Sequence, residues 1–138
     1  MSIVDWKQFL KSDSELPPDV LFHVSEEKEK EGWEGEEPEE KGGDVGAHRL
    51  LLAGASPVFR RQFFGSLRET AEVVTIRGTT VEAFRTLINY IYTPLGQFSL
   101  DHIGCPSGLF HIVNVAEKYQ LPGLRLIAKE RFSNCHKL

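Results

Sequence analysis

The 138-residue sequence predicts a single α+β domain in which helix predominates. Three short segments rich in β-branched and aromatic residues come early in the chain, and the later segments carry apolar residues at helical spacing. Serine, threonine, proline and glycine stand where these helices should begin and end. A chain of this length can bury a core that is stable without a metal or a disulfide. We therefore expect one domain over residues 1–138.

Charge is distributed unevenly along the chain. The net charge is −4, but residues 26–44 contain ten acidic residues and three lysines, a net charge of −7, which leaves +3 elsewhere. The mildly basic remainder has no dense run of lysine and arginine interleaved with aromatic residues, so we expect no nucleic-acid partner. No apolar run reaches 18 residues, and we therefore expect no membrane partner either.

The cysteines and the N-terminus indicate an intracellular protein, cytoplasmic or nuclear. Cys105 and Cys135 are the only cysteines, and neither lies in a CxxC motif or a Cys/His cluster with zinc spacing. Two scattered cysteines are typical of a reducing compartment. The first residues lack the basic region and apolar run of a secretory leader.

An amphipathic helix is predicted over residues 3–11. Ser2-Ile3-Val4-Asp5 has the form of a capping box, and Ile3, Trp6 and Leu10 then fall on one helical face with Phe9 beside them. A lone helix of this length is marginally stable in water. We therefore expect it to dock on another surface.

Three strands are predicted, over residues 19–24, 44–47 and 73–76. Between the first two, residues 26–44 form an acidic segment whose composition favours a flexible loop. A solvated spacer is the favoured interpretation of this loop. A dedicated acidic binding motif stays open because Trp33 is the one large apolar residue within it.

Five helices are expected after the second strand. Residues 48–53 are apolar enough for a buried helix, and Ser56-Pro57 predicts the start of the next, which Gly65 ends. Thr79-x-x-Glu82 resembles a capping box. The helix that follows carries the clearest apolar stripe of the chain, Phe84, Leu87, Ile88, Ile91 and Tyr92. Leu109 to Tyr119 forms a further helix, and Pro122 begins the last.

Motifs of catalysis are not found in the sequence. It contains no GxxxxGK[ST], GxGxxG, GxSxG or HExxH pattern. Among the five histidines only His102 follows a carboxylate, Asp101, and this pair is more typical of a helix cap. The carboxylates concentrate in the acidic segment, where solvation leaves no burial-shifted general acid. We expect no enzyme activity, catalytic residue, cofactor, metal or small-molecule substrate.

Five segments, in order from residue 19 onward, resemble motifs of the BTB/POZ domain family. They are Asp19-Val20-Leu21-Phe22, Ala47-His48-Arg49-Leu50-Leu51-Leu52-Ala53, Ser56-Pro57-Val58-Phe59 with Phe63, Phe84 with Tyr90-Ile91-Tyr92-Thr93, and Ala116-Glu117-Lys118-Tyr119-Gln120-Leu121. The resemblance implies a cluster of helical hairpins capped by a small three-stranded sheet. It also implies a protein-interaction module. The turn between the first two strands is about twenty residues here and only a few in the family, an insertion that costs little in closure entropy.

The resemblance implies homodimerisation through the helix that precedes the first strand. In this chain that helix is the amphipathic segment with Ile3, Trp6, Phe9 and Leu10. A two-fold interface uses the same surface of both subunits. Docking of the helix within its own chain is the less favoured alternative.

The resemblance also implies recruitment of a cullin-3 type ubiquitin-ligase scaffold. Family members that bind it carry a hydrophobic-x-Glu motif just after the S-x-x-F-x-x-x-F helix. Leu67-Arg68-Glu69 stands at that spacing beyond Phe63. We expect Phe63, Leu67 and Glu69 to form the cullin-binding site, with Leu67 in an apolar pocket and Glu69 accepting hydrogen bonds at its rim.

Two other members of the family remain as alternatives. One is the dimerisation and co-repressor-binding domain of a transcriptional regulator, although the zinc fingers that follow such domains are not found in this sequence. The other is a channel-type tetramerisation domain, which lacks the A-H-[KR]-x-x-L-A segment. The substrate of a ubiquitin ligase is normally chosen by a second domain, and the present sequence does not identify it.

Overall fold

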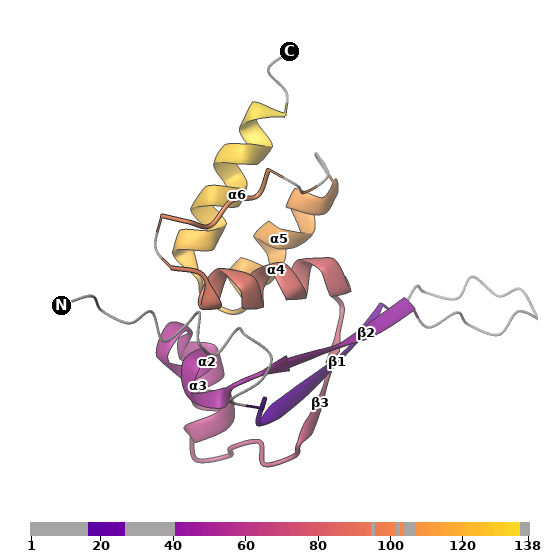
Figure 1. Ribbon diagram of the computed structural model, residues 1–138, viewed down its shortest axis with the longest axis vertical. Helices are drawn as coiled ribbons and strands as arrows, with labels where there is room; N and C mark the ends of the chain where they lie inside the picture. Colours follow the sequence, from indigo (N-terminus) through magenta and orange to yellow (C-terminus); the bar gives the residue numbers. More distant parts are fainter. Residues whose placement is uncertain (1–16, 27–40, 95, 102, 104–106, 136–138) are drawn as a thin grey trace, which may run out of the picture.

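Strands and helices follow each other as the sequence predicts. A computed structural model describes residues 17–26, 41–94, 96–101, 103 and 107–135 (Figure 1). The elements in these residues are β1 (Val20–Glu26), β2 (Lys41–Ala47), α2 (Arg49–Ala55), α3 (Pro57–Phe64), β3 (Val73–Arg77), α4 (Val81–Tyr92), α5 (Ser107–Lys118) and α6 (Pro122–Asn134). The α+β prediction with helix predominating is confirmed. The predicted helix over residues 3–11 and residues 27–40 of the acidic segment lie outside the described residues.

The sheet has the strand order β2-β1-β3, with β1 antiparallel to β2 and parallel to β3. The acidic loop predicted over residues 26–44 is too long, because β1 extends to Glu26 and β2 begins at Lys41, which are partners in the ladder. Glycines at positions 42 and 43 of β2 gave that segment a low strand propensity. The ladder with β1 determines the strand instead, since its hydrogen bonds join backbone groups.

Phe22 lies at the centre of the core. It is fully buried, and in the ladder it is opposite Val45 of β2 and Val74 of β3. Its ring centre lies 4.9 Å from that of Phe84, 5.9 Å from Phe59 and 6.1 Å from Phe63. Aromatic pairs with tilted or edge-on geometry each contribute about 0.5–1.5 kcal/mol beyond the area that they bury. This one side chain therefore joins the sheet to α3 and α4.

Helix α4 lies between the sheet and the α5–α6 hairpin (Figure 1). The predicted stripe of Phe84, Leu87, Ile88, Ile91 and Tyr92 is buried throughout, so this prediction is confirmed. The predicted cap at Thr79 is wrong by one residue. Thr80 is the N-cap, and its hydroxyl accepts a hydrogen bond from Ala83 N–H at 3.1 Å. Neighbouring threonines offer the same chemistry, and only the local backbone decides between them.

Ser56 joins the start of α3 to the end of α5. Its hydroxyl accepts from Phe59 N–H at 3.3 Å, as the sequence predicts for an N-cap, and donates to the carbonyl oxygen of Tyr119 at 2.6 Å. The Tyr119 ring stacks on Phe59 with centres 4.5 Å apart. Burial raises the pKa of Tyr119 to about 12. The end of α5 is therefore fixed against α3.

Cys135 follows α6 and is disulfide-bonded in the structure. The one other cysteine of the chain, Cys105, lies outside the described residues. The sequence interpretation took the two cysteines as typical of a reducing compartment, so a disulfide was not expected. Sequence spacing alone does not show which cysteines a fold brings together, because the bond requires their Cα atoms within about 7 Å.

We expect Gly123→Ala to destabilise the fold by about 1–3 kcal/mol, because an added Cβ in α6 would overlap the Tyr90 hydroxyl. Gly54→Ala in α2 is the matched control, since a Cβ there meets nothing within 4 Å. The control should stabilise by about 0.5–1 kcal/mol, because alanine is the better helix former. Urea unfolding of both variants measures the difference. Equal stability of the two would contradict the close approach of Tyr90 to α6.

Candidate functional site

The connection between α3 and β3 carries the predicted partner-binding residues. Helix α3 ends at Phe64 and is capped by Gly65, whose N–H donates to the carbonyl oxygen of Arg61 at 3.0 Å. A Cβ on residue 65 would overlap that same carbonyl group, so glycine is required for the chain to leave the helix here. Residues 66–72 then run exposed to the start of β3.

Phe63 and Leu67 have opposite environments. The Phe63 side chain is 3% exposed and its ring stacks on Phe59 in the core, so it supports α3 and does not offer a contact surface. Leu67 is 96% exposed, and the neighbouring Phe64 is 54% exposed. The direct contact expected from Phe63 is thus incompatible with its burial. Of the three predicted residues, only Leu67 and Glu69 lie at the surface.

The loop around Leu67 is closed by hydrogen bonds from Glu69. The N–H of Glu69 donates to the carbonyl oxygen of Gln62 at 2.6 Å, which brings the end of the loop back to the last turn of α3. The Glu69 carboxylate accepts from Ala71 N–H at 2.9 Å through Oε1. Glu69 is therefore engaged by its own loop, and this role was not foreseen from the sequence.

Arg49 of α2 reaches the same loop from the other side. Its Nη2 donates to the carbonyl oxygen of Ala71 at 2.8 Å, and its Nη1 donates to the carbonyl oxygen of Asp19. The guanidinium carbon lies 5.5 Å from the centre of the Phe63 ring, within range of a cation–π interaction. The sequence placed Arg49 in a family motif but gave no sign of these contacts, which join residues fourteen to thirty positions apart.

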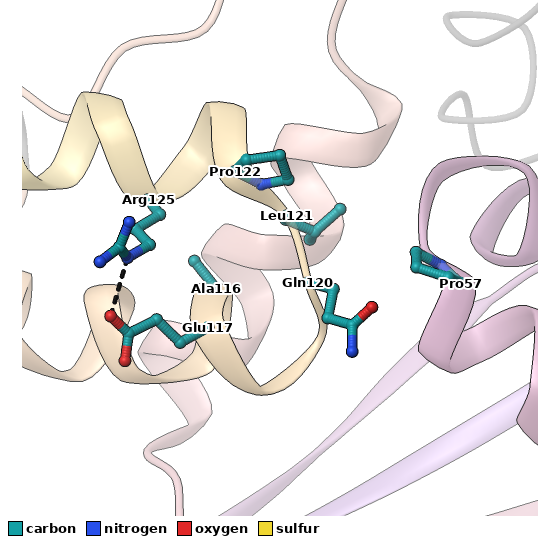
Figure 2. A pocket seen from close by; sticks show the side chains of 7 residues that line it. All are labelled: Pro57, Ala116, Glu117, Gln120, Leu121, Pro122 and Arg125. Carbon is teal, nitrogen blue, oxygen red and sulfur yellow. Dashed lines mark hydrogen bonds and ion pairs between the residues drawn. The ribbon is translucent and has the colours of Figure 1, made fainter.

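A second surface feature is a hollow of about 550 Å³ between the start of α3 and the turn from α5 to α6 (Figure 2). It is lined by Pro57, Ala116, Glu117, Gln120, Leu121, Pro122 and Arg125. Glu117 Oε1 accepts from Arg125 Nε at 2.7 Å along one side. Sequence reasoning used several of these residues as fold motifs and missed the hollow, because it forms where two distant segments meet.

Two of the histidines that the structure describes, His23 and His48, are hydrogen-bonded to other side chains. His23 Nδ1 lies 2.8 Å from Asp44 Oδ1 across the β1–β2 ladder, on exposed side chains. His48 Nδ1 lies 2.7 Å from the Tyr92 hydroxyl, which also accepts from His48 N–H at 2.8 Å. Burial raises the pKa of Tyr92 to about 12. Within residues 17–26, 41–94, 96–101, 103 and 107–135, His, Cys, Asp and Glu form no group of three that could hold a metal.

The predicted dimer residues Ile3, Trp6, Phe9 and Leu10 lie outside the described residues. Leu50 of α2 is 77% exposed and is a further large apolar side chain at the surface. None of the helices that the structure describes is long and apolar enough to cross a membrane.

Both an exposed leucine on a hydrogen-bonded loop and a separate hollow between the start of α3 and the α5–α6 turn are features through which a protein can contact a partner. Comparison with protein families agrees, since residues 39–135 match the BTB/POZ domain. The chain belongs to the BTB/POZ domain family, whose domain is a non-catalytic module of protein–protein interaction. The match begins after β1.

Several curated proteins are similar to this chain over part of their length. The BTB/POZ and MATH domain-containing protein 3 of Arabidopsis thaliana is 28% identical over 91% of this chain and 28% of its own length. The mouse TD and POZ domain-containing protein 2 is 32% identical over 70% of this chain and 25% of its own. Human Kelch-like protein 21 is 45% identical over 38% of this chain and 9% of its own. The chain thus spans under a third of these relatives.

Two solved structures share the fold. The BTB domain of zebrafish PATZ1 superposes with a TM-score of 0.56 at 17% identity, covering 85% of this chain and 76% of its own. The BTB domain of human gigaxonin gives a TM-score of 0.52 at 20% identity, covering 81% and 75%. These likenesses confirm the predicted architecture of helical hairpins capped by a small three-stranded sheet.

The contrast between Phe63 and Leu67 can be measured as stability. We expect Phe63→Ala to lower the free energy of unfolding by about 3–5 kcal/mol, because it leaves a cavity in the core. Leu67→Ala should change it by less than about 0.5 kcal/mol, because that side chain is already in water. Chemical unfolding followed by circular dichroism tests both. A large loss for Leu67→Ala would mean that the leucine packs against its own chain.

Proposed function

We propose that this chain is an adaptor domain of a cullin-3 type ubiquitin ligase and that Leu67 is its principal contact with the scaffold. The observation that carries the proposal is the geometry of Leu67. The side chain is 96% exposed, yet its loop is tied back to α3 and to α2 through Glu69, Ala71 and Arg49.

The energetics favour such a contact. Fully burying a leucine in a partner pocket contributes about 1.5–3 kcal/mol. A loop that is already ordered loses less conformational entropy on binding than a flexible one, so more of that energy appears as affinity. Exposed Phe64, at the end of α3, offers additional apolar area close to Leu67 in the sequence.

The position of the motif and the architecture of the relatives support the same proposal. Leu67-Arg68-Glu69 stands where cullin-binding members of the family carry their hydrophobic-x-Glu motif. The Arabidopsis relative combines its BTB/POZ domain with a MATH domain, as its name states, and such a second domain is the kind of element that would select a substrate.

We expect the double variant Leu67→Asp, Glu69→Lys to bind the N-terminal region of a cullin-3 type scaffold at least about thirtyfold more weakly, since a buried anchor contributes about 2 kcal/mol or more. Isothermal titration calorimetry measures this. The control is Phe110→Asp, Glu130→Lys, which makes the same charge changes at exposed positions of α5 and α6. Unchanged binding by the Leu67 variant would refute the proposal.

We also propose that the chain forms a homodimer through the helix predicted over residues 3–11. Two features support this: in the predicted helix Ile3, Trp6 and Leu10 fall on one apolar face with Phe9 beside them, which needs a surface to cover it, and Leu50 on α2 is exposed. A short helix with such a face is marginal until it docks.

Removal of residues 1–12 should convert the dimer to a monomer, because it deletes the apolar face. Multi-angle light scattering gives the mass of both forms at matched concentration. The variant Trp6→Ala, Phe9→Ala, Leu10→Ala in the untruncated chain separates the effect of the apolar face from the effect of shortening. A mass that does not change on truncation would exclude this interface.

A further inference from the structure

Both backbone polar groups of Ala71 are bonded to charged side chains. Its N–H donates to Glu69 Oε1 at 2.9 Å, and its carbonyl oxygen accepts from Arg49 Nη2 at 2.8 Å. Hydrogen bonds that involve an ionised partner are roughly twice as strong as neutral ones. One end of the exposed loop is therefore held by a side chain of α2, Arg49, and by a side chain of the loop itself, Glu69.

Arg49 is itself held in place. Its N–H donates to Asp19 Oδ1 at 2.9 Å, and the guanidinium rests over Phe63 while donating to the carbonyl oxygen of Asp19. The Arg49 side chain is mostly covered, so water competes less for its hydrogen bonds. The guanidinium thus ties the loop to the start of β1 and to the core.

Leu67 depends on this backbone for its position. The hydrogen bond from Glu69 N–H to the Gln62 carbonyl oxygen, 2.6 Å long, closes the chain around residues 63–68. The leucine side chain has almost no contact with its own protein, being 96% exposed. The backbone of the loop therefore sets the orientation of Leu67, and Glu69 and Arg49 hold that backbone in place.

We propose that Arg49 and Glu69 are positioning residues for Leu67, and that Glu69 acts through the backbone of its own loop and not through its charge toward a partner. This inference rests on the proposed partner-binding role of Leu67. It gives Glu69, the glutamate of the Leu-x-Glu segment, the role of ordering the loop. It also adds to the site Arg49 of α2, which stands eighteen positions before Leu67.

The first test needs no partner. We expect the amides of Glu69 and Ala71 to exchange with solvent deuterium at least about tenfold faster in Arg49→Met and in Glu69→Ala, as measured by NMR. In Glu69→Gln the rates should stay near those of the unmodified chain, because the amide oxygen still accepts from Ala71 N–H. Arg60→Met at an exposed position of α3 and Glu72→Ala at an exposed position of the same loop are the controls and should leave both rates unchanged.

The α4 amide of Leu87 reports whether each variant is folded. Arg49 also bonds Asp19, so Arg49→Met can lower the overall stability of the domain. In that case the comparison of Glu69→Ala with Glu69→Gln decides whether the loop depends on these hydrogen bonds, because neither change affects α2. Unchanged exchange of Glu69 and Ala71 amides in folded Glu69→Ala would overturn the inference.

The second test measures affinity for the N-terminal region of a cullin-3 type scaffold. Glu69→Ala should bind about tenfold more weakly and Glu69→Gln almost normally. Loss of affinity in Glu69→Gln with normal exchange would show a charge contact with the partner and overturn the positioning role. If the unmodified chain binds no cullin, the proposed function fails, and the exchange rates still decide whether Arg49 and Glu69 order the loop.

Discussion

The packing of Phe22 against three other phenylalanine rings is the interaction on which the rest of the structure depends. The residue belongs to the central strand, so it is held on both sides by the backbone ladder and beneath by Phe59, Phe63 and Phe84. A small domain has few places where one side chain can join a sheet to two helices. Because protein interiors are packed as densely as organic crystals, a change in the volume of this side chain would disturb the packing of the sheet, of α3 and of α4. The position of the exposed loop after α3 depends on this cluster, because Phe63 is part of the core and its ring also contacts the guanidinium of Arg49.

Much of the fold was predictable because its signals are local. The apolar stripe of α4, the serine–proline start of α3 and the proline at the start of α6 each follow from periodicity or capping within a few residues. The beginning of β2 was not predictable in this way. Its glycines carry no strand signal, and the strand exists because β1 offers a partner edge. The choice between Thr79 and Thr80 as the cap of α4 has the same origin, since both residues have the required hydroxyl.

The candidate site was predictable only in part. Leu67 and Glu69 were found from a three-residue spacing, and the exposure of Leu67 agrees with a partner contact. Phe63 was assigned to the same site because it lies in the same helix motif, but its helical phase turns it inward. The contacts of Arg49 with the loop, and the hollow between α3 and α5, could not be predicted from the sequence. Each depends on segments that only the folded chain brings together. Local patterns therefore identify which residues can act, whereas tertiary contacts decide how they act.

The ladder between β1 and β2 has an architectural consequence. Its last pair, Glu26 and Lys41, lies at the end of the sheet away from α2 and α3 (Figure 1). Whatever sequence joins these two residues begins and ends at neighbouring backbone positions, and the entropy of closing it grows only with the logarithm of its length. This corner of the domain is thus a natural grafting point, where a peptide epitope or a reporter can replace the native connection while the loop of Leu67, at the opposite end of the strands, keeps its geometry. The same separation lets evolution vary the connection in length and charge without altering the core.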